Sequence, residues 1–230
     1  MKRITLFSII AATLISVNQV QADSGDSLLK ERCASCHDLT GPAAQTVEEA
    51  WQRKAPDLFY AGVKYKREWL STWLTKPTRI RPMGHHYFKH IKSSPKGDLI
   101  DRSSLLKHPV LTAAESKKAT TALLNLTASP VQLKQDEFNG KSISMSFGEM
   151  VFDKFNGCLA CHQIEPGYGG VSGPELYTAA NRLQEDFLVS FIRSPQAWSP
   201  KSPMPNRHIK EANIQKLVGY LVALSKEEWK

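Results

Sequence analysis

Spare cysteines and long hydrophobic runs are both missing from this sequence of 230 residues. Its four cysteines all fall in two Cys-x-x-Cys-His runs, so no thiol is left over for a disulfide framework or for any other purpose. Beyond the first 22 residues, no segment approaches the roughly 20 uninterrupted apolar residues that a membrane-spanning helix requires. We therefore expect the rest of the chain to be soluble.

The first residues have the composition of a secretory signal peptide. Two basic residues precede an apolar stretch over residues 4–17, and small residues lead to Ala22 just before an acidic residue. This order of charged, apolar and small residues predicts a signal peptide over residues 1–22 and export to the periplasm. An uncleaved signal that anchors the protein in a membrane is the alternative.

The two halves of the remaining chain are related by a repeat at an offset of 118 residues. The segment Pro56-Asp57-Leu58-Phe59 matches Pro174-Glu175-Leu176-Tyr177, and Pro77 matches Pro195. Aromatic and aliphatic residues between these positions match at the same offset. The sequence therefore predicts two copies of one domain.

The predicted domain boundaries follow from this repeat. A first domain covers residues 23–126 with an insertion at about residues 84–110, a polar linker covers residues 127–146, and a second domain covers residues 147–230. Each copy should contain a short helix that leads into its Cys-x-x-Cys-His run, a middle helix bounded by Pro77 or Pro195, and an amphipathic closing helix. The predicted fold class is all-α.

The two Cys-x-x-Cys-His runs have the pattern of covalent haem attachment. Two thiols one helical turn apart can form thioethers with the vinyl groups of a haem, while the adjacent histidine reaches the iron from the same side. The predicted attachment residues are Cys33, Cys36, Cys158 and Cys161, and the predicted proximal ligands are His37 and His162. A four-cysteine zinc site would leave both histidines unexplained, and no βαβ pattern favours thioredoxin-like redox centres.

With these motifs and this repeat, the chain resembles the class I cytochrome c family, in particular its tandem two-haem members of the cytochrome c4 type. The resemblance implies two haem c groups, one wrapped by each domain, and a carbonyl from Pro56 and from Pro174 that orients each proximal histidine. It also implies a distal methionine at each iron, for which Met83 and Met204 are suitably placed, each directly after a proline. A thioether ligand raises the reduction potential, as suits an electron carrier.

Several histidines compete with Met83 for the first iron. His85 and His86 follow it almost at once, and His90 and His108 lie in the insertion. Any of them could be the sixth ligand instead, or a group of them could bind an accessory metal. Three other side chains have donors suited to haem propionates: Trp198, Arg79 and Arg81.

The resemblance implies a protein that transfers electrons between redox partners and has no substrate of its own, since two ligands at each iron leave no open position. The main alternative is a dihaem peroxidase in which the first iron opens to bind peroxide. The 208 residues after the predicted signal are few for the larger peroxidase architecture. A third interpretation is a haem subunit of a larger oxidoreductase complex.

Positive charge is concentrated in the first domain. Residues 23–126 contain 17 Lys and Arg against 11 Asp and Glu, whereas residues 127–230 contain 11 of each. Within the first domain, Lys89, Lys92 and Lys96 lie in the insertion. We expect an acidic redox partner to dock there, with peripheral association with a membrane respiratory complex as a further option. Export makes nucleic acid an unsuitable partner.

Overall fold

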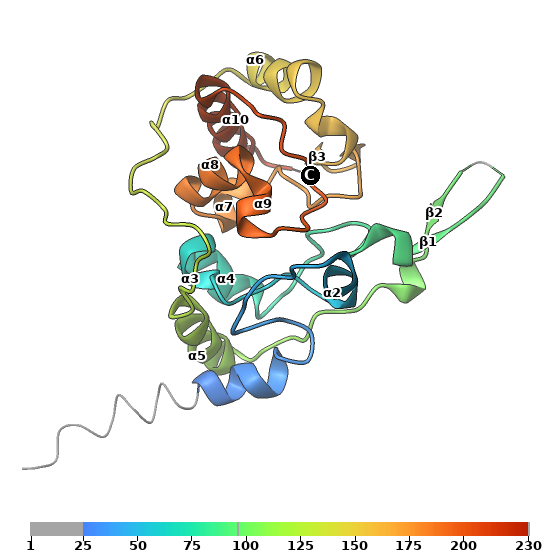
Figure 1. The fold of residues 1–230 in the computed structure, drawn as a ribbon, viewed down its shortest axis with the longest axis vertical. Helices are drawn as coiled ribbons and strands as arrows, with labels where there is room; N and C mark the ends of the chain where they lie inside the picture. The colour runs from blue at the N-terminus through green and yellow to red at the C-terminus, as the bar shows by residue number, and fades with distance from the viewer. Residues whose placement is uncertain (1–24, 96, 230) are drawn as a thin grey trace, which may run out of the picture.

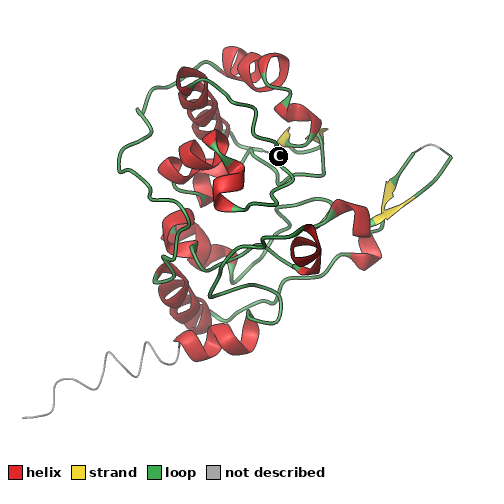
Figure 2. Cartoon of the chain, viewed as in Figure 1, coloured by secondary structure: helices red, strands yellow, loops and turns green. Residues whose placement is uncertain are grey.

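The computed structural model describes residues 25–95 and 97–229. The predicted signal peptide, at residues 1–22, and Lys96 lie outside this part. The described residues form mainly short helices joined by long irregular segments, as the all-α prediction requires, with two small sheets in addition (Figure 2). No helix among them is long and apolar enough to cross a membrane.

The first half of the chain, residues 25–126, is the lower body in Figure 1. It contains a helical segment over residues 25–32, α2 (Val47–Gln52), α3 (Ala61–Lys64), α4 (Arg67–Trp73), the 3-10 turns η1 (Tyr87–Lys89) and η2 (Arg102–Ser104), and α5 (Ala113–Leu124). Both α2 and α5 begin with a capping box, in which a threonine and a glutamate three residues later satisfy each other's backbone N–H groups. These local signals explain where the two helices start.

The second half, residues 145–229, is the upper body in Figure 1. It contains α6 (Met145–Met150), the π-helical turn η3 (Val151–Phe155), the 3-10 turn η4 (Cys158–Ala160), α7 (Ala179–Arg182), α8 (Glu185–Arg193), α9 (Pro195–Trp198) and α10 (Glu211–Leu224). Helix α8 ends before Pro195, which then occupies the first turn of α9, where its missing N–H is tolerated. The start of α6 at Met145 falls two residues inside the predicted linker.

Two antiparallel hairpins depart from a purely helical fold. β1 (Ile91–Lys92) pairs with β2 (Leu99–Ile100), and β3 (Gln163–Glu165) pairs with β4 (Tyr168–Gly169). Each turn contains a glycine with positive φ, Gly97 at 103° and Gly167 at 82°. Strands of two or three residues have no periodicity to detect, so the hydrophobic pattern did not predict them. The β1–β2 hairpin lies in the insertion and projects from the body (Figure 1).

The buried side chains form two clusters. One packs α4 and α5 of the first half together and includes Leu70, Leu74 and Leu123. The larger cluster lies in the second half, around the fully buried Trp198 and the residues of α8 and α10, and continues into the first half through Phe59 and Tyr60. The buried cluster of the second half therefore extends across the junction and includes side chains from the first half.

The halves join through a contact that obeys the 118-residue repeat. Tyr65 and Leu183, which are equivalent positions, form an antiparallel bridge. The N–H of Lys66 donates to the carbonyl of Arg182 at 3.0 Å, and the N–H of Gln184 donates to that of Lys64 at 3.0 Å. The two strands of an antiparallel bridge are related by a local two-fold axis. Because Tyr65 and Leu183 are equivalent positions, this axis relates the bonded segments of the two halves.

Side chains repeat the same symmetry at this join. Lys66 Nζ donates to the carbonyl of Ala180 at 2.7 Å, and the equivalent Gln184 Nε2 donates to the carbonyl of the equivalent Gly62 at 2.9 Å. Two reciprocal pairs of contacts at one offset are the structural counterpart of the repeat in the sequence.

Candidate haem-binding sites

Both Cys-x-x-Cys-His runs form a helical turn. The N–H of His37 donates to the carbonyl of Cys33 at 2.9 Å, and the N–H of His162 donates to that of Cys158 at 3.1 Å. Residues four apart in such a turn lie on the same face. The first cysteine and the histidine of each run are therefore brought to one side of the backbone.

All four cysteines are free thiols. Cys33 and Cys158 are half-buried, whereas Cys36 and Cys161 are exposed. Burial raises the pKa of Cys158 to about 11 and also raises the pKa of Cys33. The thiols of Cys33 and Cys158 are therefore protonated at neutral pH, whereas the surroundings of redox-active cysteines stabilise the thiolate. Among the described residues, no group of three or more His, Cys, Asp or Glu side chains is arranged to hold a metal ion.

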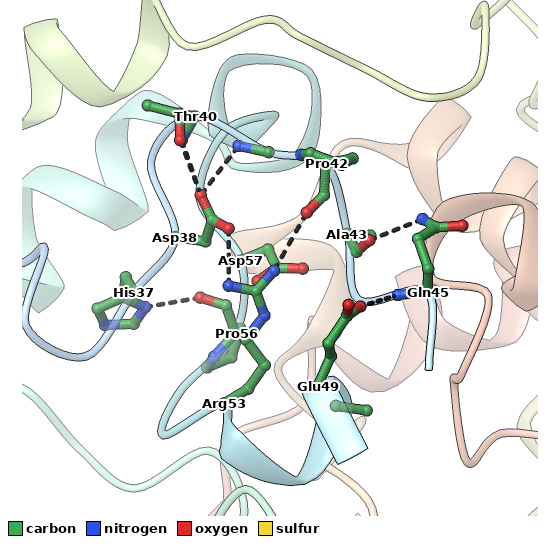
Figure 3. A network of polar contacts seen from close by, with 12 residues as sticks. His37, Asp38, Thr40, Pro42, Ala43, Gln45, Glu49, Arg53, Pro56 and Asp57 are labelled. Atoms are coloured by element: carbon green, nitrogen blue, oxygen red, sulfur yellow. Dashed lines mark hydrogen bonds and ion pairs between the residues drawn. The ribbon is translucent and has the colours of Figure 1, made fainter. Parts of the chain in front are cut away.

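Each histidine is hydrogen-bonded to the carbonyl of a proline, as the resemblance implies. His37 Nδ1 lies 2.6 Å from the carbonyl oxygen of Pro56 (Figure 3), and His162 Nδ1 lies 2.8 Å from that of Pro174. Burial lowers the pKa of both rings, so each is neutral at pH 7 and Nδ1 carries the donated proton. The lone pair of Nε2 is then left to bind a metal.

The loop that carries Pro56 is held by a polar network around Asp38 and Arg53 (Figure 3). Asp38 Oδ1 accepts from the N–H of Thr40 and of Gly41, each at 2.9 Å, and Asp38 Oδ2 pairs with Arg53 Nη1 at 2.7 Å. These contacts fix the segment between His37 and its proline. In the second half the corresponding connection is shorter and is fixed by close packing, because a side chain at Gly173 would come within 2.6 Å of His162 Cε1.

The two methionines predicted as distal ligands have different surroundings. Met204 is half-buried, its N–H donates to Ser202 Oγ at 3.3 Å, and its carbonyl accepts from Gln196 Nε2 at 2.8 Å. Met83 is buried, and its N–H donates at 3.3 Å to the carbonyl of Val171 in the second half. The Met204 loop is thus held within its own half, whereas the Met83 loop is held against the other.

Three basic residues gather where the halves meet. Burial lowers the pKa of His162, and the guanidinium charges of Arg81 and Arg182 lower it further. Lys64, the equivalent of Arg182 in the first half, places its Nζ 5.3 Å from the centre of the Tyr60 ring. Arg81, one of the three side chains predicted for haem propionates, thus lies near His162 and Arg182 where the halves meet.

The other two candidates for haem propionates are already occupied. Arg79 is exposed and donates to the carbonyl of Leu106 at 3.0 Å, and the fully buried Trp198 donates through Nε1 to Ser190 Oγ at 3.1 Å.

Sequence reasoning missed one buried ion pair in the second half. Glu175 and Arg182 are both buried, with Arg182 Nε 3.5 Å from Glu175 Oε1, and Arg182 Nη2 also donates to the carbonyl of Glu175. The 118-residue offset was the signal that could have found it, because Asp57 and Lys64 occupy the equivalent positions in the first half.

The candidate histidines of the first half are distributed over different contacts. His86 Nε2 bonds to the carbonyl of Ala50 at 2.8 Å, and His90 Nδ1 bonds to Ser104 Oγ at 2.7 Å. Burial and the neighbouring Arg81 lower the pKa of His85 to about 3, and its Nδ1 has no hydrogen-bond partner. The ring of His108 lies beside that of His37.

No protein-family model, curated protein or solved structure matches the chain.

Proposed function

We propose that the protein is an exported dihaem c-type cytochrome, with one class I-type cytochrome domain in each half, which transfers electrons between redox proteins. The observation that carries this proposal is the repeated histidine geometry. In each Cys-x-x-Cys-His run, Nδ1 of the neutral imidazole is bonded to a proline carbonyl. The two prolines, Pro56 and Pro174, are 118 residues apart in the sequence. Such a partner fixes the ring and leaves Nε2 for a metal.

The residues present fit a covalently bound haem at each run. Cys33 and Cys36, like Cys158 and Cys161, are free thiols that can be consumed in thioether bonds. His37 and His162 supply the proximal nitrogen at the two sites, and Met204 supplies a soft sixth ligand at the second. When bound, the haem provides the iron that alternates between the ferric and ferrous states.

The chain's own residues set how an electron enters and leaves. A reduced protein partner gives up one electron and an oxidised partner accepts one, so the cytochrome itself is unchanged after both transfers. His37 and His162, through their bonds to Pro56 and Pro174, hold the ring orientation on which the iron potential depends.

Haem counting and ligand binding test the proposal. Mass spectrometry of the purified holoprotein should find two covalent haems per chain, and the reduced protein should bind carbon monoxide poorly because both irons have two ligands. It should also reduce peroxide negligibly with an artificial donor. A chain without covalent haem would contradict the proposal, and rapid peroxide turnover would favour the peroxidase alternative.

The insertion is the proposed docking surface for an acidic partner. Lys92 projects from the β1–β2 hairpin with a largely exposed side chain, although its Nζ pairs with Asp101 at 2.9 Å. The exposed Lys89 lies beside it in sequence on η1 and donates to the carbonyl of Trp51. Positive charge on a projecting segment steers an acidic protein at long range and loses this effect as salt screens it.

Charge reversal of Lys89 and Lys92 tests this surface. The double Glu variant should slow electron transfer from the physiological partner at low ionic strength and flatten its salt dependence. Reversal of Lys216 and Lys226 on the second half is the matched control and should leave both quantities unchanged. Equal effects of the two variants would remove the insertion from partner recognition.

A further inference from the structure

The ring of His108 lies beside that of His37, the proposed proximal ligand of the first haem. The ring centres of His37 and His108 are 6.3 Å apart, and the ring planes are inclined by 58°. His108 comes from the insertion, 71 positions after His37 in the chain. Tertiary folding, not local sequence, therefore brings the two imidazoles together.

The separation of the two rings suits one metal ion between them. An imidazole nitrogen binds a metal at about 2.0–2.1 Å, so two imidazoles on opposite sides of one ion have ring centres about 6 Å apart. The 6.3 Å spacing of His37 and His108 is compatible with this arrangement. Rings that pack without a metal reach it too, since the centres of Tyr60 and Phe187 are also 6.3 Å apart, so the assignment depends as well on which nitrogen each ring leaves free.

Both imidazoles have the same nitrogen engaged. His108 Nδ1 lies 2.8 Å from the carbonyl of Pro109, just as His37 Nδ1 lies 2.6 Å from that of Pro56. The Nε2 atom is the one left for a metal on each ring. A backbone carbonyl on Nδ1 is the usual outer contact of a histidine that ligates through Nε2.

The position of His108 is fixed by the fold. Its ring packs edge-on against Trp73, whose Nε1 donates to the carbonyl of Thr78 at 3.1 Å. Shortly after it, the N–H of Leu111 donates to the carbonyl of Leu74 at 3.0 Å, which ties the end of the insertion to the end of α4. The half-buried His108 is therefore held on both sides.

The closing helices place His108 near the position of Met204. His108 lies four residues before Thr112, the N-cap of α5, and Met204 lies six residues before Lys210, the N-cap of α10. If the two halves are aligned at their closing helices, His108 corresponds most nearly to Met204, and the extra residues of the first half lie before His108. If they are aligned at Pro77 and Pro195 instead, Met83 corresponds most nearly to Met204, and the extra residues lie after Met83.

Met83 has a different environment. Its N–H donates at 3.3 Å to the carbonyl of Val171, so its loop is held against the second half. His86 uses Nε2 itself for the carbonyl of Ala50, and the ring of His85 packs against that of His86 with 4.5 Å between the ring centres. His90 has Nδ1 bonded to Ser104 Oγ, as His108 has Nδ1 bonded to Pro109, so the position of the ring and not its hydrogen bond distinguishes the two. Among the described residues, His108 is the one whose ring is found against His37.

We propose that His108, rather than Met83, is the sixth ligand of the first haem, so that this iron has two histidine ligands and the second has histidine and methionine. The inference rests on the proposed haem attachment at Cys33 and Cys36. Because methionine ligation raises the reduction potential, the first haem then has the lower potential of the two. Electrons that enter at the basic first half pass downhill to the second.

Spectra of ligand variants in the full-length holoprotein test this assignment. Ferric haem with a methionine ligand has a weak long-wavelength band, and Met204→Ala should abolish that band completely. Met83→Ala, the matched control, should leave it at its original intensity. His108→Ala should open one iron per chain to carbon monoxide in the ferrous state, and added imidazole should restore the six-coordinate spectrum.

The outcomes separate this inference from the proposed function. A band that survives in Met204→Ala and disappears in the double variant with Met83→Ala would assign Met83 and overturn the inference, while two covalent haems would still uphold the cytochrome. An unchanged spectrum in His108→Ala would also overturn it. Absence of covalent haem at Cys33 and Cys36 would instead contradict the proposed function. The Met204→Ala measurement leaves the first half intact, so it remains decisive even if His108→Ala does not fold.

Discussion

Equivalent acidic and basic residues behave differently in the two halves. In the second half Glu175 and Arg182 form a buried ion pair, and Glu175 also accepts from the N–H of Thr178 at 3.0 Å. In the first half Asp57 lies at the same distance of 3.5 Å from Arg53 Nε, but Arg53 pairs more closely with Asp38 at 2.7 Å, and burial raises the pKa of Asp57. Lys64 is left against the rings of Tyr60, Tyr65 and Phe187.

The difference shows which features of the repeat are fixed by the backbone. Each histidine bonds to the main-chain carbonyl of a proline, and the bridge between the halves joins main-chain atoms of equivalent residues. The ion pair uses side chains, and a shorter carboxylate with a lysine does not reproduce it. A lysine can then take a cation–π contact in place of a carboxylate. The backbone contacts are therefore common to both halves, whereas the buried charged side chains differ between them.

Removal of one haem at a time is the strongest way to compare the halves. Cys33→Ser with Cys36→Ser, and Cys158→Ser with Cys161→Ser, should each remove one haem in mass spectrometry. We expect the first-half variant to lose more local stability, because the buried cluster of that half is the smaller and depends more on the added apolar surface.

Peptide-resolved hydrogen exchange measures this local stability. The first-half variant should lose protection over α4 and α5, and the second-half variant should retain more of its protection over α8 and α10. Loss of protection over the whole chain in both variants would mean that the halves do not unfold separately.

The buried acidic residues give a second comparison. Glu175→Gln should lower the free energy of unfolding by about 3 kcal/mol, because it leaves the buried Arg182 without its carboxylate. Asp57→Asn should change it by less than about 1 kcal/mol, since burial already disfavours the charged form of Asp57. Urea denaturation of the two holoproteins measures both values, and equal losses would contradict the distinction.

The smallest effect concerns pH at the hairpin that only the first half contains. A hydrogen bond from Ser103 and the pairing with Lys92 lower the pKa of Asp101 to about 2, below the ordinary value of 3.8. A depressed pKa means that the contact stabilises the folded hairpin above pH 4 and is lost as the pH falls toward 2.

The carboxyl signal of Asp101 in an NMR titration checks this pKa. Lys92→Ala should move the midpoint upward toward the ordinary value, and Lys89→Ala should move it less, since Lys89 contacts the carbonyl of Trp51. A midpoint near 3.8 in the unmodified protein would show that the ion pair does not form in solution.

Local signals in the sequence predicted much of the frame. The prolines that bound the middle helices, Pro77 and Pro195, act within one or two turns, so they were recognised without knowledge of the fold. The capping pair of Thr112 with Glu115 is equally local but was not among the predictions. The 118-residue offset predicted that the halves are copies, and it is repeated in the bridge of Tyr65 with Leu183. The short hairpin β1–β2 escaped prediction because two residues per strand carry no pattern.

The sequence by itself predicted the two haem-attachment motifs, because covalent attachment needs two thiols and a histidine at one fixed local spacing. The resemblance to class I cytochromes c added Pro56 and Pro174 as expected partners of the histidines. Only the tertiary structure could place the ring of His108 beside that of His37. The proposed sixth ligand depends on where a distant segment crosses the site, which is set by the packing of Trp73 and the hydrogen bond between Leu111 and Leu74.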